Sequence, residues 1–139
     1  MRKILLLFFI ILQMGCGCGS WTRTVELGNN FGLVENDNTQ IQYDRRGDKE
    51  CFYSIESAVV VPAEVVAYNY DERWIIAKSR HRNFKKNYSF WIIDKEYSFS
   101  RLGYHDELKR QTLGPLDSIQ FQKELLRYGI KLKLKGSKE

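Results

Sequence analysis

Short runs of alternating apolar and polar residues make up most of the chain, and turn-forming residues separate them. In the first half these runs occupy residues 22–27, 31–35, 39–43 and 51–55, at a spacing of about 8–12 residues. Such alternation places the apolar side chains on one face of a β-strand. The spacing is typical of antiparallel strands joined by turns and argues against strands that alternate with helices.

The middle of the chain predicts a hairpin and a third strand beside it. Residues 64–70 and 73–79 flank a turn at Asp71 and Glu72, and residues 88–94 follow after a polar loop. The second of these runs is apolar on both faces, which is the pattern of a strand that is covered on both sides. We therefore expect it in the centre of its sheet, with the third run as its next antiparallel neighbour.

The C-terminal part predicts one helix and one edge strand. Residues 117–128 carry apolar side chains at helical spacing, with Asp117 as the N-cap, Gln120 completing a capping box and Gly129 as the stop. Residues 130–135 alternate strictly between aliphatic side chains and lysines. Lysines on an exposed edge discourage pairing with other chains, so this run fits an edge strand.

The stretch before this helix is polar. One helical turn is expected around residues 106–110 of the polar stretch 97–112, and Gly114 and Pro115 are expected to break the chain before the helix. The predicted fold class is α+β: a mostly antiparallel β-sheet meander with one C-terminal helix packed on the sheet. A single β-rich domain is expected over residues 22–139, a length that can bury a core.

The beginning of the chain follows a different pattern. Arg2 and Lys3 precede an apolar run over residues 4–12, which is shorter than the ~20 residues needed to span a bilayer. Gly15 and Cys16 close this segment. A positively charged start, a short apolar run and small residues at its end are typical of a secretory signal peptide.

The segment that ends at Cys16 resembles a bacterial lipoprotein signal, in which a cysteine at the cleavage site receives lipid. The cysteine and the glycine before it match, whereas Gln13 and Met14 depart from the pattern. The resemblance implies a signal peptide over residues 1–15, acyl chains such as palmitate on Cys16 and a tether over residues 16–21. Two or more acyl chains give stable membrane attachment. The alternative is an ordinary signal peptide that is cut nearby.

Lipid on Cys16 would leave two cysteines in an oxidising compartment. Cys18 and Cys51 are then an even pair, and a disulfide between them would join the tether to the domain. The alternative is that Cys51 is a small buried strand residue and that Cys18 has no partner. The sequence leaves both alternatives open.

Charge narrows the range of partners. The chain has 22 basic and 17 acidic residues and a formal net charge of +5, and loss of Arg2 and Lys3 with the leader lowers it to +3. This mild excess does not indicate nucleic-acid binding, and an exported protein would rarely meet nucleic acid. We therefore expect no nucleic-acid partner.

Residues that carry catalysis or bind metal are sparse in the sequence. His81 and His105 each lack a second His or Cys at the spacing usual in zinc sites. Serine-nucleophile and glycine-rich phosphate-loop motifs are absent from the sequence. Asp71, Glu72 and Asp94 lie at expected strand ends, where acidic residues serve turns more often than catalysis. We therefore predict a protein that is not an enzyme and that binds no cofactor or metal.

The best candidate for binding is a basic loop. Its cations are interleaved with an aromatic side chain, in the order Lys78, Arg80, Arg82, Phe84, Lys85 and Lys86. A hairpin loop of this composition suits anionic lipid headgroups, an anionic envelope polymer or an acidic protein. The alternative is a solvated loop whose charge only keeps the protein soluble.

Three pieces of the chain form a recognisable pattern. A Tyr-Asp-Glu turn leads into an aromatic-Ile-Ile-Ala-Lys strand, a Trp-Ile-Ile-Asp-Lys strand follows, and a Gly-Pro-Leu step leads into the final helix. They correspond to residues 70–78, 91–95 and 114–116. Over about residues 65–129 the chain is similar to a family of small bacterial lipoproteins of unknown function. The resemblance supports the fold and the lipid anchor but implies no catalytic residues.

These features predict a lipid-anchored bacterial cell-envelope protein that acts as a non-enzymatic interaction or scaffold module. It would lie on the exported side of the cell membrane or outer membrane. Its expected partners are the membrane, through the lipid anchor, and an envelope protein or anionic envelope polymer. The alternative function is a small inhibitor or immunity-type protein that binds a secreted or envelope enzyme through residues 78–88.

Overall fold

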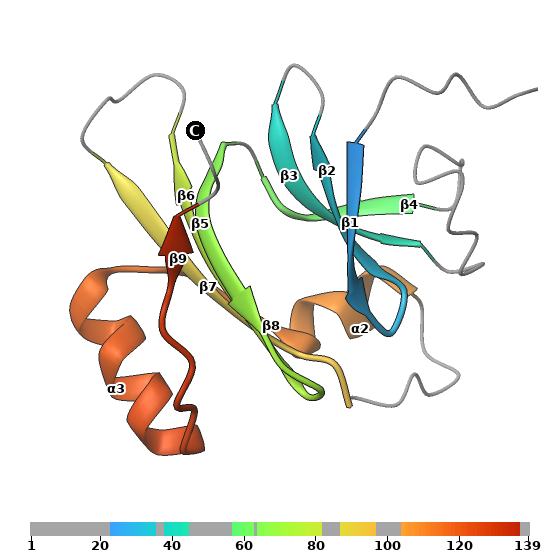
Figure 1. Cartoon of the computed structure of the whole chain (residues 1–139). Coiled ribbons are helices and arrows are strands. Elements are labelled where there is room, and N and C mark those ends of the chain that lie inside the picture. Colours follow the sequence, from blue (N-terminus) through green and yellow to red (C-terminus); the bar gives the residue numbers. More distant parts are fainter. Residues whose placement is uncertain are drawn as a thin grey trace, which may run out of the picture.

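The computed structural model of the chain describes residues 23–35, 38–44, 57–62, 64–81, 87–96 and 104–136. In this part of the chain the strands form two antiparallel sheets, accompanied by two helices (Figure 1). The predicted α+β class with mostly antiparallel strands is therefore confirmed. The strands do not form one meander, however, because the chain leaves the first sheet after residue 61 and starts a second sheet at residue 65.

The first sheet has four strands in chain order. They are β1 (Arg23–Gly28), β2 (Phe31–Glu35), β3 (Thr39–Asp44) and β4 (Ser57–Val61). The first three confirm the predicted strands to within one residue at each end. The strand expected over residues 51–55 lies outside the described residues, and β4 was not predicted.

The turn between β1 and β2 brings the first sheet into contact with the second. Asn29 and Asn30 have φ angles of 49° and 66°, in the left-handed region that asparagine tolerates and that two-residue hairpin turns require. The side-chain Nδ2 of Asn29 donates to the backbone oxygen of Lys95 at 2.9 Å. Lys95 directly follows a strand of the second sheet, so this turn links the two sheets.

The second sheet has five strands in the order β8-β7-β6-β5-β9. They are β5 (Val65–Tyr70), β6 (Trp74–Arg80), β7 (Tyr88–Asp94), β8 (Thr112–Leu116) and β9 (Lys135–Gly136). The predicted hairpin is confirmed as β5 and β6. The strand that is apolar on both faces, β6, lies in the centre of the sheet as expected, and β7 is its antiparallel neighbour.

Two expectations near β8 were incomplete or wrong. Gly114 and Pro115 do not break the chain but lie inside β8, joined by a cis peptide bond. Proline is tolerated there because β8 is an edge strand, where a missing N–H costs no ladder hydrogen bond on the open side. The helical turn expected around residues 106–110 is a longer helix, α2 (Tyr104–Gln111).

The C-terminal helix is confirmed in detail. α3 (Ser118–Tyr128) has Asp117 as its N-cap, with both hydrogen bonds of the capping box to Gln120 formed. Gly129 ends the helix with φ 66°. The edge strand expected over residues 130–135 is shorter, because only β9 pairs with β5. Its alternation is nevertheless correct, since Ile130, Leu132 and Leu134 pack against the second sheet and the lysines between them are exposed.

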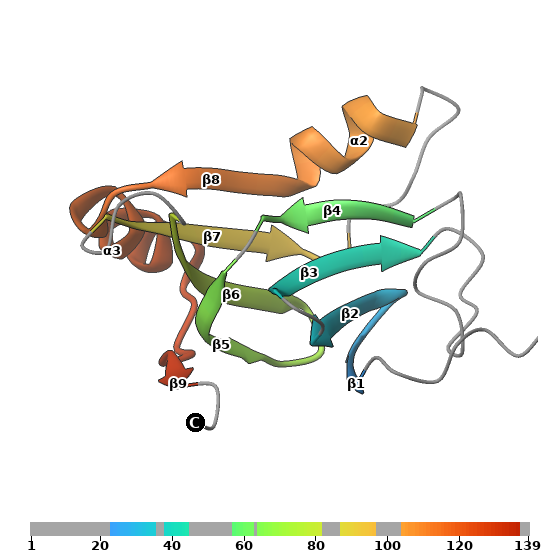
Figure 2. The same cartoon turned by 90° about the horizontal axis from the view of Figure 1, so that it is seen from above.

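The first sheet lies on one face of the second sheet and α3 on the other (Figure 2). An apolar core lies on each of these two faces. Along β6, Ile75 and Ala77 belong to the core between the sheets, whereas Trp74 and Ile76 belong to the core under α3. This alternation explains why β6 is apolar on both faces. The layers are therefore the first sheet, the second sheet and α3 with the C-terminal segment.

Candidate functional site

Lys95 is buried where the two sheets meet. Only 6% of the residue is exposed. Its Nζ donates to the backbone oxygen of Leu27 at 2.7 Å and to the backbone oxygen of Asp71. Burial lowers the pKa of Lys95 below its usual 10.5, and the negative charges of Asp71 and Glu72 oppose this shift. The amine thus ties the end of β1 to the β5–β6 turn.

Beside Lys95, an ion pair joins the β5–β6 turn to the end of β7. The Nε and Nη2 atoms of Arg73 lie 3.3 and 3.0 Å from the two carboxylate oxygens of Asp94, and Nε lies 3.4 Å from Glu96. Asp71 Oδ1 accepts the backbone N–H groups of Arg73 and Trp74 at 2.9 and 2.7 Å. Asp71 and Asp94 are therefore engaged in a turn and an ion pair.

The residues of the sequence pattern meet around β6 and β7. The β5–β6 turn contacts the end of β7 through Lys95, whose backbone N–H also donates to Arg73 O at 2.7 Å. Trp91 Nε1 donates to Ser79 Oγ at 2.8 Å inside the core. Gly114 packs on the same indole, because a Cβ at this position would lie 2.4 Å from Trp91 Cε3. The pattern is thus explained by contacts between its three pieces.

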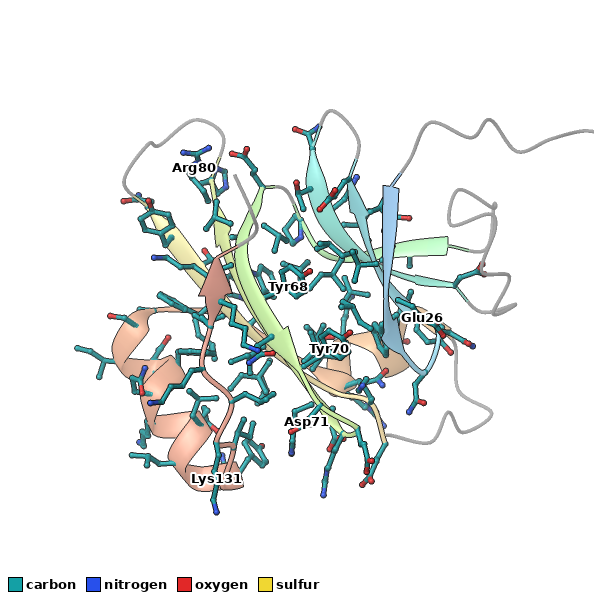
Figure 3. All side chains as sticks on the ribbon, viewed as in Figure 1. Glu26, Tyr68, Tyr70, Asp71, Arg80 and Lys131 are labelled. Carbon is teal, nitrogen blue, oxygen red and sulfur yellow. The ribbon has the colours of Figure 1, made fainter. Side chains whose placement is uncertain are left out.

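The basic patch is described only at its beginning. Lys78 and Arg80 lie on β6, toward the end of the sheet opposite Asp71 (Figure 3). Arg80 Nε lies 3.0 Å from Glu64 Oε2, and Lys78 Nζ lies 3.9 Å from the ring centroid of Tyr88. The structure therefore brings these two cations together and engages each with a neighbour. The other four residues of the patch lie outside the described residues: Arg82, Phe84, Lys85 and Lys86.

The surface formed by the described residues includes two cavities that the sequence did not predict. The larger, of about 570 Å³, lies between residues 87–90 at the start of β7 and residues 115–118 before α3. The smaller, of about 310 Å³, lies between β4 and β8 and is called the β4–β8 slot here. It is lined by residues 58–60 with Trp91, Leu108, Lys109, Thr112 and Gly114. The apolar run 58–61 was the signal in the sequence that could have revealed β4.

The remaining predicted residues are not brought into one site. His81 is exposed beyond the end of β6, and His105 lies in α2. Cys16, Cys18 and Cys51 lie outside the described residues. Across the described ranges, no three His, Cys, Asp or Glu side chains are grouped to hold a metal ion. None of the helices in the described part of the chain is long and apolar enough to cross a membrane.

The geometry defines a two-sheet α+β domain with one helix packed on the second sheet. The chain belongs to a family of proteins of unknown function (DUF3997), which matches residues 28–138. The match begins at the last residue of β1 and extends beyond β9, so it includes β2, β3 and β4 of the first sheet, the whole second sheet and both helices. The expectation of an uncharacterised family is thereby confirmed. Comparison with curated proteins gave no match, and comparison with solved structures gave none.

Proposed function

We propose that this protein is a lipid-anchored bacterial cell-envelope protein that acts as a non-enzymatic interaction module. The observation that carries the proposal is the sequence before the first strand: two cations, the apolar run over residues 4–12, and Cys16 after a glycine. Lipid on Cys16 would hold the domain on the exported side of the cell membrane or outer membrane.

The short distance along the chain between Cys16 and the domain supports this proposal. β1 begins at Arg23, seven residues after Cys16. Seven extended residues span at most about 25 Å, so an anchored domain would stay close to the membrane surface. Arg23 pairs with Glu35 in the first sheet. We therefore expect this end of the first sheet to be the part of the domain nearest to the membrane.

The charged groups near the strand ends support a binding module over an enzyme. Arg73 pairs with Asp94, Arg80 with Glu64, and Lys95 donates to two backbone oxygens. Side chains engaged in this way stabilise turns and the contact between the sheets. A general acid or base has to exchange protons with a substrate, which these contacts do not favour.

The anchor is tested by labelling cells with a palmitate analogue. We expect the label on the wild-type protein and on Cys18→Ser, and its loss from Cys16→Ser. Cys18→Ser is the matched control because it removes the neighbouring thiol and leaves the proposed acceptor in place. Equal labelling of Cys16→Ser and wild type would contradict the proposal.

A second candidate function is a small inhibitor or immunity-type protein that binds a secreted or envelope enzyme through residues 78–88. The observation that favours it is Tyr88, which is 42% exposed and has the Lys78 amine over its ring. An exposed aromatic side chain beside a cation is a common anchor in protein interfaces. This candidate predicts that Tyr88→Ala abolishes co-purification of one enzyme without changing the fold. Unchanged co-purification would contradict it.

A further inference from the structure

In the β4–β8 slot an edge strand from each sheet borders the same cavity. β4 is an edge strand of the first sheet and β8 an edge strand of the second. Residues 58–60 of β4 and Thr112 and Gly114 of β8 line one cavity of about 310 Å³. In Figure 2 both strands run in the same direction along one side of the molecule, with α2 at one end.

Both strands are edge strands among the described residues, but only β4 presents its edge to the slot. Among the described residues β4 pairs only with β3, and β8 pairs only with β7. In an antiparallel ladder, the main-chain N–H and C=O groups of alternate residues point to opposite sides of the strand. The open side of an edge strand therefore presents donors and acceptors that another extended chain can pair with. Ala58, Val59 and Val60 are consecutive, so the slot borders the edge of β4. Thr112 and Gly114 instead lie on the face of β8 that is turned toward the core between the sheets.

The side chains of the slot combine an apolar floor with one cation. Trp91 and Leu108 belong to the core between the sheets and also line the slot. Val59 on β4 is an apolar side chain that is 52% exposed. Lys109 on α2 lines the slot and is exposed to solvent. The slot can therefore hold an apolar side chain of a ligand on Trp91 and Leu108. Lys109 can pair with a carboxylate of the same ligand.

We propose that the β4–β8 slot binds an extended acidic-and-apolar segment of a partner protein by strand addition. The segment runs antiparallel to β4, pairs its main chain with the open side of β4, and lies over the face of β8 that carries Thr112 and Gly114. Its apolar side chains rest on Trp91 and Leu108, and an acidic side chain contacts Lys109. The peptide contributes main-chain hydrogen bonds, and the pockets for its side chains give specificity.

A peptide fits the slot better than an acyl chain does. An acyl chain buries apolar surface but leaves the main-chain groups of the β4 edge without partners, whereas a peptide supplies donors and acceptors at the spacing of a strand. The junction of α2 and β8 supports the same chemistry. Thr112 lines the slot, and its buried Oγ1 atom hydrogen-bonds to no described residue. Buried polar atoms are nearly always hydrogen-bonded in folded proteins, and a bound peptide would supply such a hydrogen bond here.

The inference rests on the proposed role as an interaction module and not on the lipid anchor. Peptide binding is measured with the purified chain, whereas the anchor is measured by labelling in cells. Loss of peptide binding with normal labelling would contradict the slot alone. Normal peptide binding with no labelling at Cys16 would contradict the anchor alone.

The experiment begins with a displayed library of random heptapeptides, selected against the full chain in detergent. The selected peptides are synthesised with a fluorescent label, and their dissociation constants are measured by anisotropy. We expect alternating apolar residues with an acidic residue toward one end. N-methylation of the central backbone N–H groups should weaken binding at least tenfold, because it removes the donors that strand addition uses.

Two matched variants locate the binding surface. Val59→Lys places a charge on the edge of β4 and should weaken binding at least tenfold. Leu126→Lys makes the same change at an 83% exposed residue of α3, outside the slot, and should leave binding unchanged. Circular dichroism establishes that both variants are folded. Any of three results would overturn the proposal. The first is binding that survives both N-methylation and Val59→Lys. The others are displacement of the peptide by myristate and failure of the selection to give a binding peptide.

Discussion

Lys95 Nζ and the backbone oxygen of Leu27 lie 2.7 Å apart, and this hydrogen bond joins the end of β7 in the second sheet to β1 in the first. The same amine donates to Asp71 O in the β5–β6 turn. Three segments that are distant in sequence therefore meet at one nitrogen atom. Because Lys95 is 6% exposed, water cannot readily replace it as the partner of these two oxygens.

Replacing Lys95 should destabilise the domain. Lys95→Met keeps a chain of similar length but leaves the two backbone oxygens without their donor, which costs about 1–3 kcal/mol in the free energy of unfolding. Urea denaturation measures the change. The control is Lys131→Met, at an exposed lysine of the C-terminal segment (Figure 3), which should change stability by less than about 0.5 kcal/mol. Equal stability of the two variants would show that Lys95 does not join the sheets.

The contribution of Lys95 should depend on pH in a defined direction. Burial lowers its pKa in the folded state below the usual 10.5, so the unfolded chain binds more protons between the two pKa values. Stability therefore rises with pH in that window as far as this group is concerned. We expect wild type to gain stability relative to Lys95→Met as the pH rises through the lowered pKa of Lys95 toward its usual 10.5. A difference that is constant or falls with pH would contradict the lowered pKa.

Gly114 should not tolerate a side chain. Its φ angle is 153°, and a Cβ would lie 2.4 Å from Trp91 Cε3 and 3.0 Å from Phe90 O. Gly114→Ala is expected to lower stability by about 1–3 kcal/mol through overpacking, and thermal unfolding measures the change. Gly136→Ala is the matched control, because a Cβ there meets no atom within 4 Å. A melting temperature of Gly114→Ala equal to that of the control would show that β8 shifts freely away from Trp91.

The N-cap of α3 should contribute measurably to stability. Asp117 Oδ1 accepts the backbone N–H groups of Ile119 and Gln120, both at 2.8 Å. Asp117→Ala removes this cap and should cost about 1 kcal/mol, as measured by urea denaturation. Ser118→Ala, at the next position, should have a smaller effect because no cap contact is lost. A larger loss for Ser118→Ala than for Asp117→Ala would contradict this account of the helix start.

Local patterns predicted most of the individual strands and α3. Turn residues such as Asn29 and Asn30, or the carboxylate of Asp71, act within a few residues of the strands that they join, so their effect is visible in the sequence. The division into two sheets was not predictable in this way. Alternation fixes which face of a strand is apolar, but it does not fix which strand lies beside it. The sequence pattern therefore does not show that β5 pairs with β6 in a second sheet instead of with β4 in the first.

The contacts of the candidate sites depend on residues that are far apart in the chain. A lysine at the end of a strand is usually exposed, and Lys95 is buried because of partners 68 and 24 residues away. The β4–β8 slot likewise requires an edge strand from each sheet. Gly114 and Pro115 suggested a break because glycine and proline commonly interrupt strands, whereas at an open edge a strand accommodates both.

We propose that lipid on Cys16 holds this domain at a membrane. Mass spectrometry of the N-terminal peptide from the membrane-extracted protein tests it most directly. We expect the mature chain to begin at Cys16. This residue should carry the added mass of a diacylglyceryl group, with or without a further acyl chain. A mature chain that begins at another residue, or an unmodified Cys16, would contradict it.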